Sequence, residues 1–167
     1  PDGSLNWGDG SEIEVHVPKA SRVDFVGIST DIFAEDIVGG LRINSVSGDV
    51  VTNNLQGHLM LSSVSGDIKV EKSAGRLRSS SVSGDVDVLS HVGQLDLETV
   101  SGDVAIRVVE NDKLRAKSMS GEVRVESDLL PGGFIDIETI SGDIELALQG
   151  NIGAEFDIDG GMAGDIE

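Results

Sequence analysis

A set of carboxylates recurs along the chain at regular spacing, and residues of this type in this pattern could bind a cation. The phrase Ser-Val-Ser-Gly-Asp-Val at residues 45–50 returns with small changes at 63–68, 81–86, 99–104, 118–123 and 139–144. Its acidic members are Asp49, Asp67, Asp85, Asp103, Glu122 and Asp143, and Asp31 and Asp165 occupy equivalent places nearer the two ends. If the repeats stack, these carboxylates lie about 5 Å apart in one column. They then repel one another unless something compensates their charge.

Two kinds of partner could compensate this column. One is hydrogen bonding from turn N–H groups and from a parallel column of serine hydroxyls, namely Ser47, Ser65, Ser83, Ser101, Ser120 and Ser141. The other is a cation, Ca²⁺ above all, held between rungs by Asp49, Asp67, Asp85, Asp103 and Asp143. Calcium-binding β-rolls place Asp two positions after Gly, whereas here Asp follows Gly directly and only in alternate nonapeptides. We therefore expect hydrogen bonding and no bound metal or cofactor, with calcium binding as the alternative.

Other chemistry has less support in the sequence. The histidines His16, His58 and His91 are scattered, and there is no Cys, which excludes disulfide and thiolate chemistry. The chain contains no GxSxG, no HExxH and no phosphate-binding loop. Paired acids could cleave a glycan only inside a cleft, and a regular repeat predicts flat walls. We predict a non-enzymatic protein.

Glycine spacing predicts the elements that hold the carboxylates. The glycines of the repeated phrase are 18 residues apart at first, and the last two steps are 19 and 21 residues; they are Gly48, Gly66, Gly84, Gly102, Gly121 and Gly142. Apolar and polar residues alternate around each of them, as in a strand with one buried face. A second series at Gly39, Gly57, Gly75 and Gly93 falls midway, which gives a nine-residue unit. Because nine is odd, the alternation must break once in each unit, near Asn53-Asn54 or Glu71-Lys72. We expect turns at the glycines and at these breaks.

These features predict an all-β fold: a single-stranded parallel β-helix, or β-solenoid, with about 18 residues in each coil and roughly eight rungs. Three apolar columns would fill it. The first is Val46, Val64, Val82, Val100, Met119 and Ile140; the second is Val50, Ile68, Val86, Val104, Val123 and Ile144; the third is Leu59, Leu77, Leu95 and Leu114. On this assignment Val82→Asp would bury a charge and cost several kcal/mol, and Ser83→Ala would cost roughly 1 kcal/mol.

The chain is predicted to be one domain, residues 1–167. Residues 1–22 are expected to form a lead-in and N-terminal cap, with a strand from Glu12 to Val17 that ends at Pro18. Residues 23–167 are expected to form the stacked rungs, which would continue beyond the C-terminus. Residues 128–133 lengthen one half-repeat and are expected to loop out.

Charge and hydropathy limit the partners. The formal net charge is −18, so nucleic acid is excluded as a partner. The charge is uneven, since residues 125–167 hold 11 acids and no Lys or Arg. No run of 18 apolar residues is present, so no membrane span is expected. The chain begins at Pro1 rather than Met, so a leader could have been removed.

The repeated Ser-Val-Ser-Gly-Asp-Val, together with the Val-His-Val-Pro of residues 15–18, resembles a bacterial family of adhesin-type β-solenoid domains of unknown function. This family is related to the group called toastrack domains, and the resemblance runs from about residue 13 to residue 166. It implies a non-enzymatic, envelope-associated protein and carries no catalytic residue to this chain.

The function predicted from repeat and resemblance together is adhesion or scaffolding in the periplasm, at the cell surface or outside the cell. The protein or cell-surface partner is not specified by the sequence. Two alternatives remain: a subunit that assembles end to end into an oligomer or filament through the solenoid ends, and a calcium-binding module similar to a β-roll.

Overall fold

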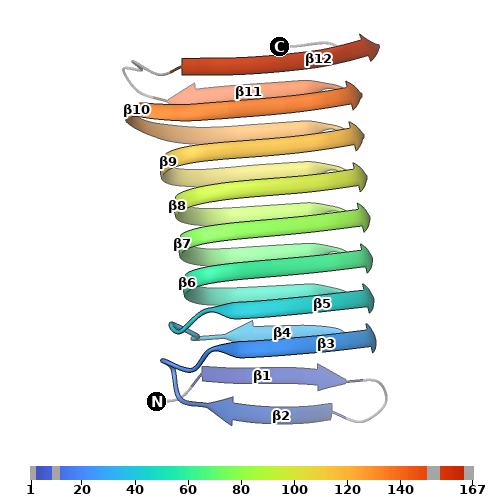
Figure 1. The fold of residues 1–167 in the computed structure, drawn as a ribbon, viewed down its shortest axis with the longest axis vertical. Helices are drawn as coiled ribbons and strands as arrows, with labels where there is room; N and C mark the ends of the chain where they lie inside the picture. Colours follow the sequence, from blue (N-terminus) through green and yellow to red (C-terminus); the bar gives the residue numbers. More distant parts are fainter. Residues whose placement is uncertain (1–2, 9–11, 150–154, 164–167) are drawn as a thin grey trace.

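The computed structural model describes residues 3–8, 12–149 and 155–163, and they form a parallel β-solenoid of about seven turns (Figure 1). The strands are β1 (Gly3–Gly8), β2 (Glu12–Val17), β3 (Val23–Ser29), β4 (Asp31–Glu35), β5 (Leu41–Ser47), β6 (Val50–Ser65), β7 (Ile68–Ser83), β8 (Val86–Ser101), β9 (Val104–Ser120), β10 (Val123–Ser141), β11 (Ile144–Gln149) and β12 (Glu155–Ala163). Among these residues there is no helix long and apolar enough to cross a membrane.

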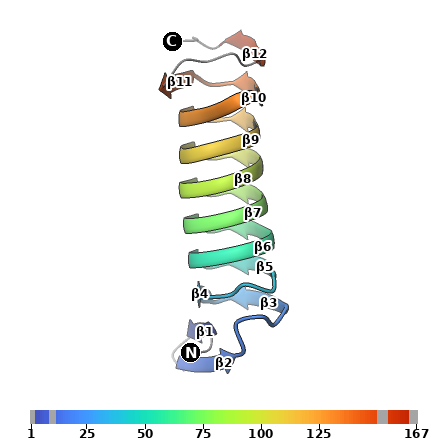
Figure 2. The same ribbon diagram turned by 90° about the vertical axis from the view of Figure 1, so that its left-hand side faces the viewer.

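Each coil sits directly on the previous one, as the glycine spacing predicts. Leu59 pairs with Leu77, and Leu77 with Leu95, in parallel register. Every coil has two layers, which Figure 2 shows edge-on. One layer contains β3, β5 and the second halves of β6 to β10, with β12 pairing to β10; we call its outer surface the long face. The other contains β4, the first halves of β6 to β10, and β11; its outer surface is the short face. The predicted fold class is confirmed.

The repeated Ser-Gly-Asp forms one of the two corners of each coil. Gly66 has φ of 142°, a left-handed conformation that glycine adopts without strain. A Cβ at this position would lie 2.3 Å from the carbonyl oxygen of Gly48 one rung away. The six glycines of this corner (Gly48, Gly66, Gly84, Gly102, Gly121 and Gly142) all have positive φ. Close stacking of backbone on backbone therefore requires glycine at this corner.

The opposite corner contains the predicted break in alternation. Asn54 and Lys72 have φ of 54° and 51°, and Ser90 has φ of 58° in the next coil. These residues turn the chain before the second glycine series, in which Gly57 and Gly75 are paired. The break expected near Asn53-Asn54 and Glu71-Lys72 is confirmed.

Two of the three predicted core columns are confirmed. The column that begins with Val50 and Ile68 and the column of Leu59, Leu77, Leu95 and Leu114 are fully buried. The third is wrong. Its members Val46, Val64, Val82, Val100, Met119 and Ile140 superpose from rung to rung, but they lie outside and are 43–57% exposed. The buried column at this place is Ser45, Ser63, Ser81, Thr99, Ser118 and Thr139.

The error has a physical cause at the Ser-Gly-Asp corner. In β5 the inward residues are Leu41, Ile43 and Ser45, whereas Val50 and Thr52 point inward after the corner. The turn at Gly48 therefore shifts the alternation by one residue, and Val46 cannot be in phase with Val50. Small Ser and Thr side chains fill the interior at this corner, where the two layers converge.

An antiparallel hairpin flanks the first coil. β1 pairs with β2 and also with β4, where Ser4 lies opposite Glu35 and Gly8 opposite Asp31. The hairpin therefore covers the outer edge of β4, which would otherwise present unpaired backbone groups. At the other end of the molecule, the ladder between β9 and β10 shifts register between Leu129 and Phe134, where the longer half-repeat was expected.

Candidate functional site

The carboxylates of the Ser-Gly-Asp corner form a ladder in which each accepts a hydrogen bond from the next rung. The Asp49 N–H donates to Asp31 Oδ1 over 2.9 Å, and the Asp67 N–H to Asp49 Oδ1 over 3.0 Å. Equivalent contacts of 2.8 Å join the N–H groups of Asp85, Asp103 and Glu122 to the carboxylates of Asp67, Asp85 and Asp103. The predicted compensation by turn N–H groups is confirmed for these rungs. For Asp49, Asp67 and Asp85 the donor is the backbone N–H of the next rung and not a hydroxyl of the serine column.

These carboxylates are also the candidate calcium ligands. Within the described part of the chain, no three His, Asp or Glu side chains come together in a way that could hold a metal ion. In Asp49, Asp67, Asp85 and Asp103, Oδ1 already accepts a backbone N–H. Asp143 follows in the same column, since Val123 pairs with Ile144. Calcium binding by these carboxylates remains a prediction for experiment.

The valine of each repeat forms an apolar ridge along one side of the long face. Its members are Ile28, Val46, Val64, Val82, Val100, Met119 and Ile140, and their exposed fractions run from 43% to 71%. A shallow groove of about 490 Å³ lies beside this ridge between β3 and β8, and the polar residues Asn44, Ser62 and Ser80 also line it. We call this column the valine ridge. Sequence reasoning missed it because it placed the same valines inside.

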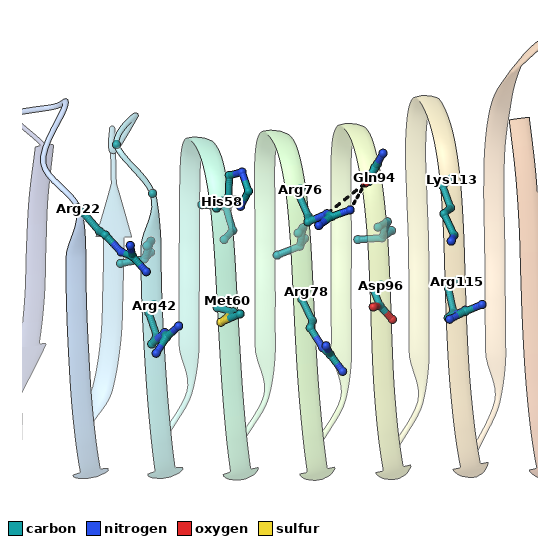
Figure 3. Close-up of a pocket in the computed structure, with 16 residues that line it drawn as sticks. Arg22, Arg42, His58, Met60, Arg76, Arg78, Gln94, Asp96, Lys113 and Arg115 are labelled. Atoms are coloured by element: carbon teal, nitrogen blue, oxygen red, sulfur yellow. Dashed lines mark hydrogen bonds between the residues drawn. The ribbon is translucent and has the colours of Figure 1, made fainter.

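A second groove, of about 610 Å³, lies on the same face and gathers basic side chains (Figure 3). It is lined by half of the chain's 12 Lys and Arg residues: Arg22, Arg42, Arg76, Arg78, Lys113 and Arg115. Asp96 is the single carboxylate among the described residues that line it. We call it the basic groove. In a chain with net charge −18, this concentration of positive charge is unexpected.

Most cations of the basic groove have no carboxylate partner. The two exceptions are Arg115, with its Nε 2.7 Å from Asp136 Oδ2, and Arg78, 3.5 Å from Glu98. Arg76 donates to the neutral Gln94 amide oxygen over 2.8 and 3.1 Å, as Figure 3 shows. Lys113 Nζ lies 5.9 Å from the ring centroid of Phe134. The Nε of Arg42 is buried without a hydrogen-bond acceptor.

Cations on the short face are paired more fully. Lys69 lies 3.0 Å from Glu71, and Arg107 lies 3.4 Å from Glu126. Arg124 contacts Glu145 at 2.5 Å and Glu122 at 2.6 Å, and the pKa of Arg124 is raised chiefly by the hydrogen bond to Glu145. These three cations of the short face therefore have carboxylate partners, whereas four of the six in the basic groove have none.

One Ser–His contact lies inside the solenoid. Ser73 Oγ is 2.8 Å from His91 Nδ1, and His91 Nε2 is 3.2 Å from the Gln94 carbonyl oxygen. A carbonyl only accepts, so Nε2 carries the proton of the neutral ring and Nδ1 accepts from the Ser73 hydroxyl. Ser73 and His91 are 3% and 0% exposed. The pair is out of reach of a substrate and fills the core.

The basic groove could not be found by counting charges along the chain, because residues 37–124 hold 11 acids and 10 bases. It forms because Arg42, Met60, Arg78, Asp96 and Arg115 follow one another in register across five strands. The signal was present as a spacing of 36 and 37 residues between Arg42, Arg78 and Arg115, but its meaning depends on knowing which positions face outward.

The repeat structure is matched by a family model. The model for Toastrack DUF4097 matches residues 4–91 and again residues 83–165. The chain belongs to the Toastrack DUF4097 family. The family is one of unknown function, and the resemblance to toastrack domains inferred from the repeats is confirmed. No curated protein and no solved structure gives a significant match.

Proposed function

We propose that this Toastrack DUF4097 protein is a non-enzymatic adhesion or scaffold module of the bacterial cell envelope or exterior. The observation that carries the proposal is the valine ridge, which exposes seven apolar side chains in one line. Contiguous exposed apolar surface of this kind marks protein interaction sites. A partner protein with an apolar strip would bury the ridge without any change in the rod.

The rod suits a scaffold because its surface is repetitive. Adjacent ridge residues are about 4.8 Å apart, the spacing of neighbouring strands. A partner can therefore contact several equivalent positions at once, and each contact adds to the same binding energy. The hydrogen-bonded coils beneath hold these positions in place, so little ordering cost falls on this chain.

A periplasmic, cell-surface or extracellular location is part of the proposal. The lack of Cys and the acidic composition are compatible with it. Protease treatment of intact and permeabilised cells of the source bacterium tests it directly. Degradation only after the inner membrane is opened would contradict the location.

The ridge is tested by replacing Val64, Val82 and Val100 together with Asn. The matched control replaces Val38 and Val92, which are also 44% exposed but lie off the ridge. We expect both variants to keep the melting temperature of the parent, and the ridge variant alone to lose binding to envelope fractions. Turnover of a glycan panel by the parent protein at enzyme-like rates would contradict a non-enzymatic role.

Self-assembly is the second candidate, and the valine ridge favours a lateral form of it. Two ridges packed side by side would each cover the other, which is a self-complementary contact. Assembly end to end was the form expected from the sequence, but the antiparallel β1–β2 hairpin flanks the first coil and gives that end no parallel edge at β4. Sedimentation velocity distinguishes the two candidates. Self-assembly predicts a larger species that the Asn variant abolishes, and a scaffold for another protein predicts a monomer.

A further inference from the structure

We propose that the basic groove binds a linear acidic polysaccharide that carries one carboxylate in every second sugar. The groove and the valine ridge use different columns of the long face, so this inference does not depend on the ridge. Its basis is the rung-by-rung order of charges in the groove.

Positive charge in the groove is periodic. On β5, β7 and β9 the outward positions carry Arg42, the pair Arg76 and Arg78, and the pair Lys113 and Arg115. On the strands between them, the positions in register are His58 and Met60 on β6 and Gln94 and Asp96 on β8. From β5 to β9, cations therefore recur at every second rung, about 9.6 Å apart along the rod. Arg22 stands outside this alternation, because it directly precedes β3, the strand that pairs with β5.

This spacing fits a polymer with alternating acidic and neutral units. Guanidinium groups bind carboxylates through paired hydrogen bonds, so Arg42 on β5 and Arg76 on β7, which have no carboxylate partner, suit the acidic units, and Lys113 supplies the unpaired cation on β9. Between them, the amide of Gln94 and the imidazole of His58 can hydrogen-bond hydroxyl groups, and Met60 offers an apolar contact. Asp96 faces the groove on β8, one of the strands that carry no groove cation. Its carboxylate would repel a polymer charged at every unit.

Other linear anions fit less well. The strands beneath the groove are paired on both sides, so a peptide cannot add to a sheet edge there. An extended acidic peptide repeats its side chains on one side about every 6.8 Å, which is out of step with cations about 9.6 Å apart. Nucleic acid has phosphates spaced at about 3.4 Å in each strand, and the net charge of −18 repels such dense charge more than a sparsely charged chain.

The unpaired cations of the groove supply further support. Arg22, Arg42, Arg76 and Lys113 have no carboxylate within ion-pair distance among the described residues, whereas Arg78 and Arg115 do. A polymer carboxylate in the groove would give these charges a partner.

Calorimetry with defined oligosaccharides tests the proposal. The probes are hyaluronate oligomers, with a carboxylate on alternate sugars, polygalacturonate oligomers, with one on every sugar, neutral chitin oligomers, and polyglutamate. We expect hyaluronate to bind best, with affinity that falls as salt is added. Absence of hyaluronate binding, or equal binding of polyglutamate, would overturn the proposal.

Two variants locate the binding. R76Q/R78Q removes two exposed groove cations and should weaken hyaluronate binding about tenfold or more. R107Q/R124Q removes the same charge from the short face and should leave the affinity within about twofold. Equal loss in both variants would mean that only net charge matters, and would overturn the groove assignment. D96N should selectively improve polygalacturonate binding; an unchanged preference would overturn the alternating pattern.

Discussion

His91 is a buried histidine whose protonation the fold disfavours. Burial lowers the pKa of His91 below its ordinary value of 6.5, because the charged ring would lose its hydration; hydrogen bonds to the backbone of Gln94 and Gly75 oppose this only in part. The unfolded chain therefore binds a proton more readily than the folded chain. The contribution that neutral His91 makes to the free energy of unfolding is fully present above pH 6.5. It is lost as the pH falls from 6.5 towards the lowered pKa.

His91→Leu isolates this effect. Leucine suits the site, since Leu55 occupies the same interior column. Between pH 7.5 and 5.5 we expect the parent to lose stability relative to this variant, by at most about 1.4 kcal/mol for each pH unit. Denaturant unfolding at several pH values measures the difference. The exposed His58→Gln is the control, and a parent and His91→Leu variant with parallel pH profiles would contradict the prediction.

The two valines on either side of Gly84 test the corrected inside–outside assignment. Val82 is 47% exposed and Val86 is 1% exposed. Val82→Asn should change the free energy of unfolding by less than about 1 kcal/mol, whereas Val86→Asn should cost several kcal/mol because it buries an unpaired amide. Equal costs at Val82 and Val86, measured by chemical denaturation, would mean that Val82 lies inside.

Ser81 tests the same assignment from the interior side. Ser81→Ala should be close to neutral or stabilising in the same denaturation experiment, since the Ser81 hydroxyl is buried without a partner.

At the scale of the corner and the coil, the closest packing is between the stacked corner glycines of successive rungs. A Cβ on Gly84 would lie 2.4 Å from the Gly66 carbonyl oxygen, and its φ is 141°. Gly132 also has positive φ, 82°, but nothing lies within 4 Å of its Cβ position. Gly132→Ala should therefore cost only the backbone strain, about 1–2 kcal/mol. Gly84→Ala should cost clearly more, because the stacked rung must also move. Similar melting temperatures for the two variants would show that the coils have room to separate.

The sequence was sufficient to predict the fold, but not to predict which residues beside the Ser-Gly-Asp corner point into the core. A period of 18 residues fixes the register, so the Val50 and Leu59 columns could be placed correctly. The side on which Val64 lies depends on a one-residue shift of phase at Gly66: Ser63 keeps the inward phase of Leu59 and Leu61, whereas Val64 would share the phase of the core residue Ile68 only if the corner did not shift it. Hydrophobicity favours valine inside, and the narrow corner favours serine. The basic groove does not depend on that choice: Arg76 and Arg78 flank Leu77, which was correctly placed inside, so the alternation in that strand already directs both side chains outward.

For the whole molecule, the dominant long-range force is electrostatic repulsion between its excess negative charges. A net charge of −18 on a slender rod opposes compaction, and screening by salt weakens that repulsion. Surface ion pairs such as Lys69–Glu71 and Arg107–Glu126 lose strength in salt as well, but each contributes little. We therefore expect the melting temperature to rise with NaCl.

Calcium chloride at matched ionic strength separates screening from specific binding. Backbone N–H groups already bind one oxygen of Asp67, Asp85 and Asp103, so we expect Ca²⁺ and Na⁺ to stabilise the rod alike. Specific binding in the ladder would instead give Ca²⁺ an additional rise that chelator reverses, since a ligand that binds only the folded state raises its stability. Asp85→Asn is the deciding variant, because it removes one carboxylate charge at the middle of the ladder while leaving an oxygen that can accept the Asp103 N–H. An additional rise with Ca²⁺ in the parent that disappears in Asp85→Asn would establish the calcium site.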